Sequence, residues 1–90
     1  MKKLHYSTRA KKDLKKHRNN PRKMGKLYEV LNMLANDIEI PKVFQPHRLT
    51  GQYKNCMECH IEGDFLLIWI DEDSGIVEIL RIGSHSELFS

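Results

Sequence analysis

The stretch FLLIWIDEDSGIVEILRIG, residues 65–83, contains two apolar segments separated by a polar turn. Residues 65–70 are apolar at every position, which is typical of a central strand buried on both faces. Residues 71–75, DEDSG, have the composition of a tight turn, and residues 76–83 are expected to form the next strand. The two strands predict an antiparallel sheet as the core of the fold.

A third strand is expected over residues 53–61, where apolar and polar side chains alternate. One face would carry Met57, Cys59 and Ile61, and the other would carry Glu58 and His60. Residues 62–64 fit the turn into the central strand. The C-terminal half is therefore predicted to be a three-stranded meander. Ser84 and Glu87 have the spacing of a capping box, so a final short helical turn is expected after it.

The N-terminal half predicts one strand and two helices. Leu4 and Tyr6 fit a short edge strand, and Ser7 or Thr8 can cap a helix that runs to about Arg18. Pro21 suits the start of a second helix, whose apolar positions recur every three or four residues: Met24, Leu27, Val30, Leu31 and Leu34. Residues 36–46 contain two prolines and are expected to be extended. The fold class is α+β, with two helices on a mainly antiparallel sheet, in a single domain over residues 1–90.

Composition excludes several classes of protein. Hydrophobic residues make up 40% and charged residues 30% of the 90, which is typical of a globular domain. No apolar stretch approaches the roughly 20 residues of a membrane-spanning helix, and the basic N-terminus lacks the apolar segment of a signal peptide. We therefore expect a cytoplasmic protein without a membrane partner, whose two cysteines stay reduced.

Charge is distributed very unevenly along the chain. Residues 1–26 hold 11 of the 15 Lys and Arg residues and one acid, Asp13, which gives a net charge of +10. Residues 27–90 hold the other 4 basic residues and 11 acids, a net charge of −7. Such asymmetry indicates a polyanionic partner, most often a nucleic acid.

The segment CMECH, residues 56–60, has the spelling of a haem attachment site. In an alternating strand, however, Cys56 and Cys59 point to opposite faces and cannot reach one porphyrin edge. A zinc site would need two further ligands at definite spacing. We expect neither a cofactor nor a metal, and two ordinary cysteines on a strand.

Three of the five histidines, His47, His60 and His85, stand at the borders of predicted strands. A residue that ends one strand of a meander lies near the residue that opens the next, so His60 and Asp64 are expected to be close. Whether all three histidines converge is left open by the sequence.

Three blocks of sequence resemble the YafQ-type toxins, a branch of the RelE/ParE superfamily of bacterial type II toxin–antitoxin modules. These are HRLTG at 47–51, CHIEGDFLLIW at 59–69 and LRIGSHSELF at 80–89. The resemblance implies a RelE-like fold and a ribosome-dependent mRNA endonuclease, an mRNA interferase. It also implies a cognate antitoxin that neutralises the toxin in a complex able to bind operator DNA.

The resemblance also assigns site residues. The catalytic positions of the family fall on His47, His60, Asp64, His85 and Arg81. The substrate-binding positions fall on Phe65, where relatives can have tryptophan, on Phe89 and on Lys54.

These residue types suit RNA cleavage on chemical grounds. Attack of a 2′-hydroxyl on the adjacent phosphate needs a base, an acid for the leaving 5′-oxygen and positive charge. Histidine, with an unperturbed pKa of about 6.5, can fill both proton roles. Asp64 could orient an imidazole, Arg81 could bind phosphate oxygens, and Phe65 and Phe89 could stack on bases. No metal is required, although a set of three histidines and an aspartate could bind one.

The first helix carries like charges four residues apart, each pair costing roughly 0.2–0.5 kcal/mol. We therefore expect a face that binds RNA or the ribosome, formed by Lys11, Lys12, Lys15, Lys16, Arg18, Arg22 and Lys23. A solvated helix or contact with antitoxin or DNA are the alternatives. The main rival function is a non-catalytic module of the same fold that binds nucleic acid or a partner, such as an antitoxin-bound co-repressor. A gyrase-directed toxin is less consistent with the histidine pattern.

Overall fold

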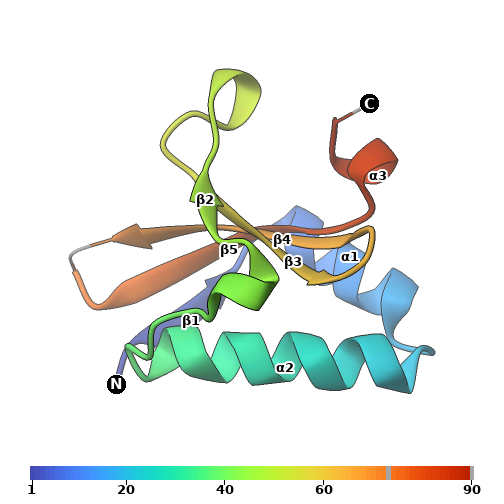
Figure 1. The fold of residues 1–90 in the computed structure, drawn as a ribbon, viewed down its shortest axis with the longest axis horizontal. Helices are drawn as coiled ribbons and strands as arrows, with labels where there is room; N and C mark the ends of the chain where they lie inside the picture. Colours follow the sequence, from blue (N-terminus) through green and yellow to red (C-terminus); the bar gives the residue numbers. More distant parts are fainter. Residues whose placement is uncertain (73, 90) are drawn as a thin grey trace.

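The computed structural model describes residues 1–72 and 74–89, and it has the predicted α+β architecture (Figure 1). Its elements are β1 (Lys3–Tyr6), α1 (Thr8–His17), α2 (Pro21–Ala35), the 3₁₀ turn η1 (Lys42–Phe44), β2 (His47–Arg48), the 3₁₀ turn η2 (Gly51–Tyr53), β3 (Met57–Glu62), β4 (Phe65–Glu72), β5 (Ile76–Gly83) and α3 (His85–Phe89). Asp73, part of the predicted turn at 71–75, lies outside the described residues.

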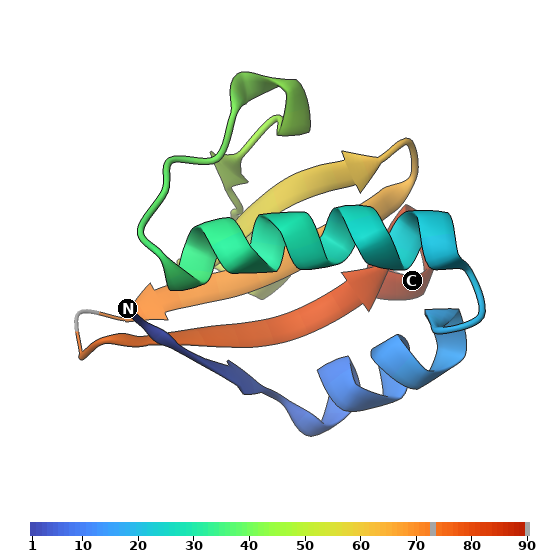
Figure 2. The same ribbon diagram turned by 90° about the horizontal axis from the view of Figure 1, so that it is seen from below.

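The five strands form one sheet in the order β1-β5-β4-β3-β2. The strands β2 to β5 are antiparallel to their neighbours, and β1 pairs in parallel with the first half of β5. The apolar strand β4 is therefore central, as predicted. Figure 2 shows α2 crossing one face of the sheet while α1 runs beside the β5 edge.

The helix α1 covers the part of the β5 edge that β1 leaves free. The Ser7 hydroxyl caps α1 by accepting from the Ala10 amide, and it donates to the Leu80 carbonyl of β5. Farther along, the Ile82 amide donates to the Asp13 carboxylate over 2.9 Å. Side chains of α1 thus satisfy backbone groups of an edge that would otherwise be exposed.

The sheet has an apolar core on each face. The α2 face carries the larger core, in which Leu27, Val30 and Leu31 of α2 meet Cys59, Leu67 and Ile79 of the strands. We call the other side the distal face; it carries Leu66 and Ile68 packed with Leu88 of α3 and partly buried Tyr53 and Phe89. Figure 1 shows η2 and α3 on this side, opposite α2.

Two predicted boundaries were wrong. The strand expected from residue 53 begins at Met57, because Gly51 and Asn55 both adopt φ of 71° and the chain turns there. The segment 36–46, expected to be extended, contains the η1 turn, and it leads into β2, a strand of two residues that sequence alone did not indicate. Within the described residues no helix is both long and apolar enough to cross a membrane.

Candidate active site

Glu58 joins two of the predicted catalytic histidines. His47 lies opposite Glu58 on the neighbouring strand, with its Nε2 3.1 Å from Glu58 Oε1. His60, two residues farther along β3, has its Nε2 3.8 Å from the same oxygen, and the two imidazole centroids are 6.2 Å apart. Only 3% of the Glu58 side chain is exposed. Glu58 is not among the predicted site residues, although it shares the polar face of β3 with His60.

A hydrogen bond to the backbone orients the His47 ring. Its Nδ1 is 2.8 Å from the Gln45 carbonyl, and because a carbonyl only accepts, Nδ1 is the donor. This bond turns Nε2 toward Glu58, whose Oε1 lies 3.1 Å away. The carboxylate of Glu58 therefore lies between the two imidazoles of His47 and His60.

The second group of predicted residues surrounds α3. The imidazole of exposed His85 packs against the Phe89 ring with the centroids 4.8 Å apart and the planes tilted by 35°, as the four-residue spacing predicts. Phe89 in turn meets Tyr53 edge-on at 5.3 Å, and the Tyr53 hydroxyl donates to the Leu88 carbonyl over 2.9 Å. Tyr53 was not a predicted site residue, and it ties α3 to η2.

Asp64 acts on His85 in a different way from the one expected. The sequence predicts that Asp64 orients an imidazole ring, but its Oδ1 accepts a 2.8 Å hydrogen bond from the backbone amide of His85. Asp64 lies in the β3–β4 turn, four residues after His60. Through this bond the turn positions the first residue of α3.

Arg81 is oriented by a bulge and by an acid from α1. The register of β4 and β5 shifts by one residue, so that Ile68 pairs with Arg81 and Trp69 with Ile79. The guanidinium donates from Nε and Nη2 to Asp13, over 2.9 and 3.3 Å. The bond to Asp13 raises the pKa of Arg81 above its ordinary value. Tyr53 is a second hydrogen-bond partner of Arg81, so the N–H groups that neither Asp13 nor Tyr53 engages are the ones left for a phosphate.

Strand register places both groups on the distal face. His47 pairs with Glu58, Glu58 with Ile68, and Ile68 with Arg81, so these side chains form one row across four strands. In the next row His60 pairs with Leu66, and Leu66 with Gly83, which is followed closely by His85. Since neighbouring strands lie about 4.8 Å apart, roughly 10 Å separates the β3 backbone from that of β5. The buried side chains of β4 lie between the two groups.

The expected stacking role of Phe65 does not fit the structure. Its side chain is 1% exposed and belongs to the core on the α2 face. The His17 ring covers it at a centroid distance of 5.1 Å, and the Lys23 ammonium lies 5.3 Å from its centre. A base cannot reach this ring unless those side chains move.

The predicted basic face is partly engaged by acids of the same chain. Lys16 pairs with Glu87, and Arg22 pairs with Glu62 over 2.6 Å. Among the described residues the structure gives no acidic partner to Lys11, Lys12, Lys15 or Arg18, whose side chains are exposed. Lys54 is exposed at the end of η2.

The two cysteines lie on opposite faces of the sheet, as predicted. Cys59 is in the core on the α2 face and Cys56 is in the distal core. Burial raises the pKa of Cys59 to about 12, so its thiol stays protonated and is a poor metal ligand. Across residues 1–72 and 74–89, no three His, Cys, Asp or Glu side chains are arranged to hold a metal ion.

Glu87 completes the predicted capping box and also ties α3 to α1. Its Oε1 accepts from the Ser84 amide over 2.7 Å, while the Glu87 amide donates to the Ser84 hydroxyl over 3.2 Å. A Cβ at Gly83 would lie 2.7 Å from Glu87 Oε1, so any larger residue there would displace the Glu87 carboxylate from this cap. The ammonium of Lys16 is the main reason that the pKa of Glu87 falls from 4.5 to about 2.

We expect Glu87 to stabilise the fold in a pH-dependent way. A carboxyl whose pKa is lowered by folding contributes fully above its unfolded pKa and loses that contribution as pH falls through the folded pKa. The stability difference between wild type and Glu87→Gln, measured by urea denaturation, should therefore be largest at pH 7 and shrink from about pH 4.5 toward 2. Glu39→Gln, at an exposed position, is the matched control. A Glu87→Gln deficit that stays constant over this range would contradict the assignment.

Comparison with known proteins agrees with this fold and arrangement. The family model described as "Bacterial toxin of type II toxin-antitoxin system, YafQ" matches residues 2–90. The mRNA interferase toxin YafQ of Escherichia coli strain K12 is 31% identical over 87 residues, covering 96% of this chain and 94% of that protein. The chain belongs to the YafQ family of toxins of type II toxin–antitoxin systems.

Solved structures are similar over the whole chain. A crystal structure of a copper-bound variant toxin from Helicobacter pylori has a TM-score of 0.89 and 37% identity, covering 99% of this chain and all of that one. A crystal structure of the Escherichia coli DinJ-YafQ complex gives a TM-score of 0.87 and 28% identity, with both chains fully covered. These matches confirm the predicted fold.

Proposed function

We propose that this toxin is an mRNA endonuclease that cuts translated mRNA on the ribosome by metal-free acid–base catalysis. The observation that carries the proposal is the placement of two histidine groups on either side of β4 on the distal face. His47 and His60 lie on the β2–β3 side, and His85 lies beyond β5. The names of the relatives support an RNA-cleaving activity, since the Escherichia coli protein is an mRNA interferase.

The separation of the groups suits the reaction. When a 2′-oxygen attacks phosphorus, the 5′-oxygen leaves from the opposite side, so the base and the acid must flank the phosphate. Backbones roughly 10 Å apart leave room for a phosphate between imidazoles that extend toward it. Each imidazole can take or give the proton that its side of the reaction needs.

The hydrogen bonds favour different roles for the two groups. Glu58 Oε1 lies 3.1 Å from His47 Nε2 and 3.8 Å from His60 Nε2, where a carboxylate can stabilise an imidazolium acid, and this suits the side that protonates the leaving 5′-oxygen. The described contacts give the His85 ring no hydrogen-bond partner, so its nitrogens are open to accept a proton from the 2′-hydroxyl. We assign the acid to the His47–His60 side and the base to His85.

Charge and stacking complete the site. Arg81 lies in the same row as Glu58, and the N–H groups that Asp13 and Tyr53 do not engage can stabilise negative charge on the phosphorane. Phe89 and Tyr53 present aromatic rings beside His85, where a base of single-stranded RNA can stack. Phe89 and Tyr53 thus replace Phe65 as the aromatic contacts, while Lys54 at the end of η2 can contact the backbone of the RNA.

The partners follow from the family and the charge pattern. The DinJ-YafQ complex supports a cognate antitoxin that neutralises this toxin, in an assembly that would bind operator DNA. Four exposed basic side chains of α1 and its C-terminal end have no acidic partner among the described residues and can bind the phosphates of ribosomal RNA: Lys11, Lys12, Lys15 and Arg18. Such a toxin would act in the cytoplasm, where mRNA is translated.

Primer extension on one mRNA, with and without translating ribosomes, tests this function. We expect cuts within the coding region only when ribosomes translate, because the site is small and the larger basic face leaves substrate positioning to the ribosome. The same mRNA without a start codon is the matched control and should stay intact. Equal cleavage of ribosome-free mRNA would contradict ribosome dependence.

A further inference from the structure

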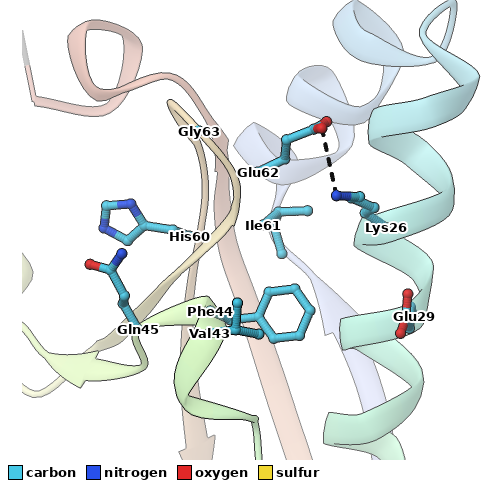
Figure 3. Close-up of a pocket in the computed structure, with 9 residues that line it drawn as sticks. All are labelled: Lys26, Glu29, Val43, Phe44, Gln45, His60, Ile61, Glu62 and Gly63. Carbon is cyan, nitrogen blue, oxygen red and sulfur yellow. Dashed lines mark ion pairs between the residues drawn. The ribbon is translucent and has the colours of Figure 1, made fainter.

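A cavity of about 500 Å³ opens beside His60, at the edge of the sheet formed by the end of β3 (Figure 3). It lies between α2, η1 and the end of β3, and its wall includes Lys26, Glu29, Phe44, Gln45 and His60. Its size falls within the roughly 300–1,000 Å³ typical of sites for small ligands. A ligand in this cavity would therefore contact His60, which belongs to the group proposed as the general acid.

The cavity exists because β2 is so short. β2 pairs only with Met57 and Glu58 at the start of β3. The preceding chain swings away as η1, so the second half of β3 has no neighbouring strand on that side among the described residues. Side chains of η1 face it across the gap, as Figure 3 shows.

The walls suit a flat and uncharged ligand. Phe44 is half-buried and Val43 is 78% exposed, so apolar surface lines the cavity in water. Glu62 is already paired with Arg22 at 2.6 Å and with Lys26 at 3.6 Å. Glu29, which has no basic partner among the described residues, adds a carboxylate on the α2 side, and this disfavours a phosphate here. A nucleobase, by contrast, can cover the apolar surface and keep its edge hydrogen-bonded.

Gln45 is placed to read such an edge. Its backbone has φ of 52° and ψ of 51°, and its carbonyl is held by the His47 imidazole, so the residue is fixed relative to the site. Figure 3 shows its amide directed toward the His60 ring. A side-chain amide both donates and accepts, as a base edge requires.

We infer that this cavity is a subsite for the base of a nucleotide next to the scissile phosphate, with Gln45 as the residue that reads the base. The inference rests on the RNA endonuclease function proposed above and adds a site for sequence preference. The ligand is a single unpaired base of the mRNA, held against Phe44 and Val43 while its phosphate reaches His60.

The test is Gln45→Glu, an isosteric change at an exposed position that leaves the backbone bond to His47 in place. A carboxylate only accepts, and guanine alone offers two adjacent donors, N1–H and the N2 amino group, on its Watson–Crick edge. Translated mRNAs should be prepared in two series, varied through all four bases at the nucleotide before or after the cut. Rates of cleavage then give a ranking of bases for each toxin. Gln52→Glu, the same change in η2, is the matched control.

We expect Gln45→Glu to shift the ranking toward guanine by about tenfold in one series, since a bidentate pair discriminates by roughly 1–3 kcal/mol. Gln52→Glu should keep the wild-type ranking. An unchanged ranking for Gln45→Glu would overturn the subsite. So would an equal loss on all four bases, which would mean that Gln45 acts only through His47. If wild-type toxin cuts none of these mRNAs, the proposed function itself fails.

Discussion

Replacement of His85 by alanine is expected to lower cleavage of translated mRNA by about 10²-fold or more. The imidazole is exposed and makes no hydrogen bond through its ring among the described contacts, so its removal takes away a proton acceptor and little packing. The α3 turn should survive, because its cap is made by Ser84, Glu87 and Asp64. Initial rates from primer extension, together with thermal melting, would measure both effects.

Two companion variants make the His85 result specific. Ser86→Ala, at the next exposed position of α3, should cleave like wild type. Truncation after Leu88 removes Phe89, which supports His85 at 4.8 Å, and should also lower cleavage strongly with a small loss of stability. If His85→Ala still cleaves within twofold of wild type, His85 is not the base.

The second large effect is expected for Glu58→Gln. The amide keeps the volume of the buried side chain but cannot neutralise an imidazolium at His47. A hydrogen bond to a charged group contributes roughly 1.5–3 kcal/mol, so cleavage should fall by about ten- to hundredfold. Because Glu58 acts through His47, it is a positioning residue.

The protonation of the His47 ring shows whether Glu58→Gln disturbs the position of this ring or the fold as a whole. In wild type, nitrogen-15 NMR of the His47 ring should show a proton on Nδ1 and an Nε2 signal that is perturbed by the neighbouring Glu58 carboxylate. In Glu58→Gln the Nε2 signal should change while Nδ1 stays bound to Gln45. Glu72→Gln, at the exposed end of β4, is the matched control. Normal cleavage by Glu58→Gln would remove Glu58 from the mechanism.

Local patterns predicted the helices and the meander because each depends on short-range physics. Ser7 and Asn20 cap the two long helices, and the apolar face of α2 packs on the sheet. The strand β2 could not be predicted because two residues are too few to show an alternation of apolar and polar side chains. Its pairing is decided by long-range contact with β3.

In the candidate site, too, residue types could be predicted from the sequence, whereas contacts between distant segments could not. His47, His60 and His85 were found from residue type and resemblance, yet their partners depend on register. Glu58 reads as an ordinary polar residue of a strand until β2 covers it. Phe65 follows a polar turn and suggests exposure, but packing of His17 over its ring buries it. Such contacts between distant segments leave no local signal.

The chemistry of the cut ends tests the central claim most directly. Attack by the 2′-hydroxyl leaves a 2′,3′-cyclic phosphate on one fragment and a 5′-hydroxyl on the other. Toxin stripped of transition metals with EDTA, with Mg²⁺ restored for the ribosome, should produce these ends from translated mRNA at the full rate. Fragments with 5′-phosphate and 3′-hydroxyl ends, or activity that returns only with zinc or manganese, would contradict metal-free histidine catalysis.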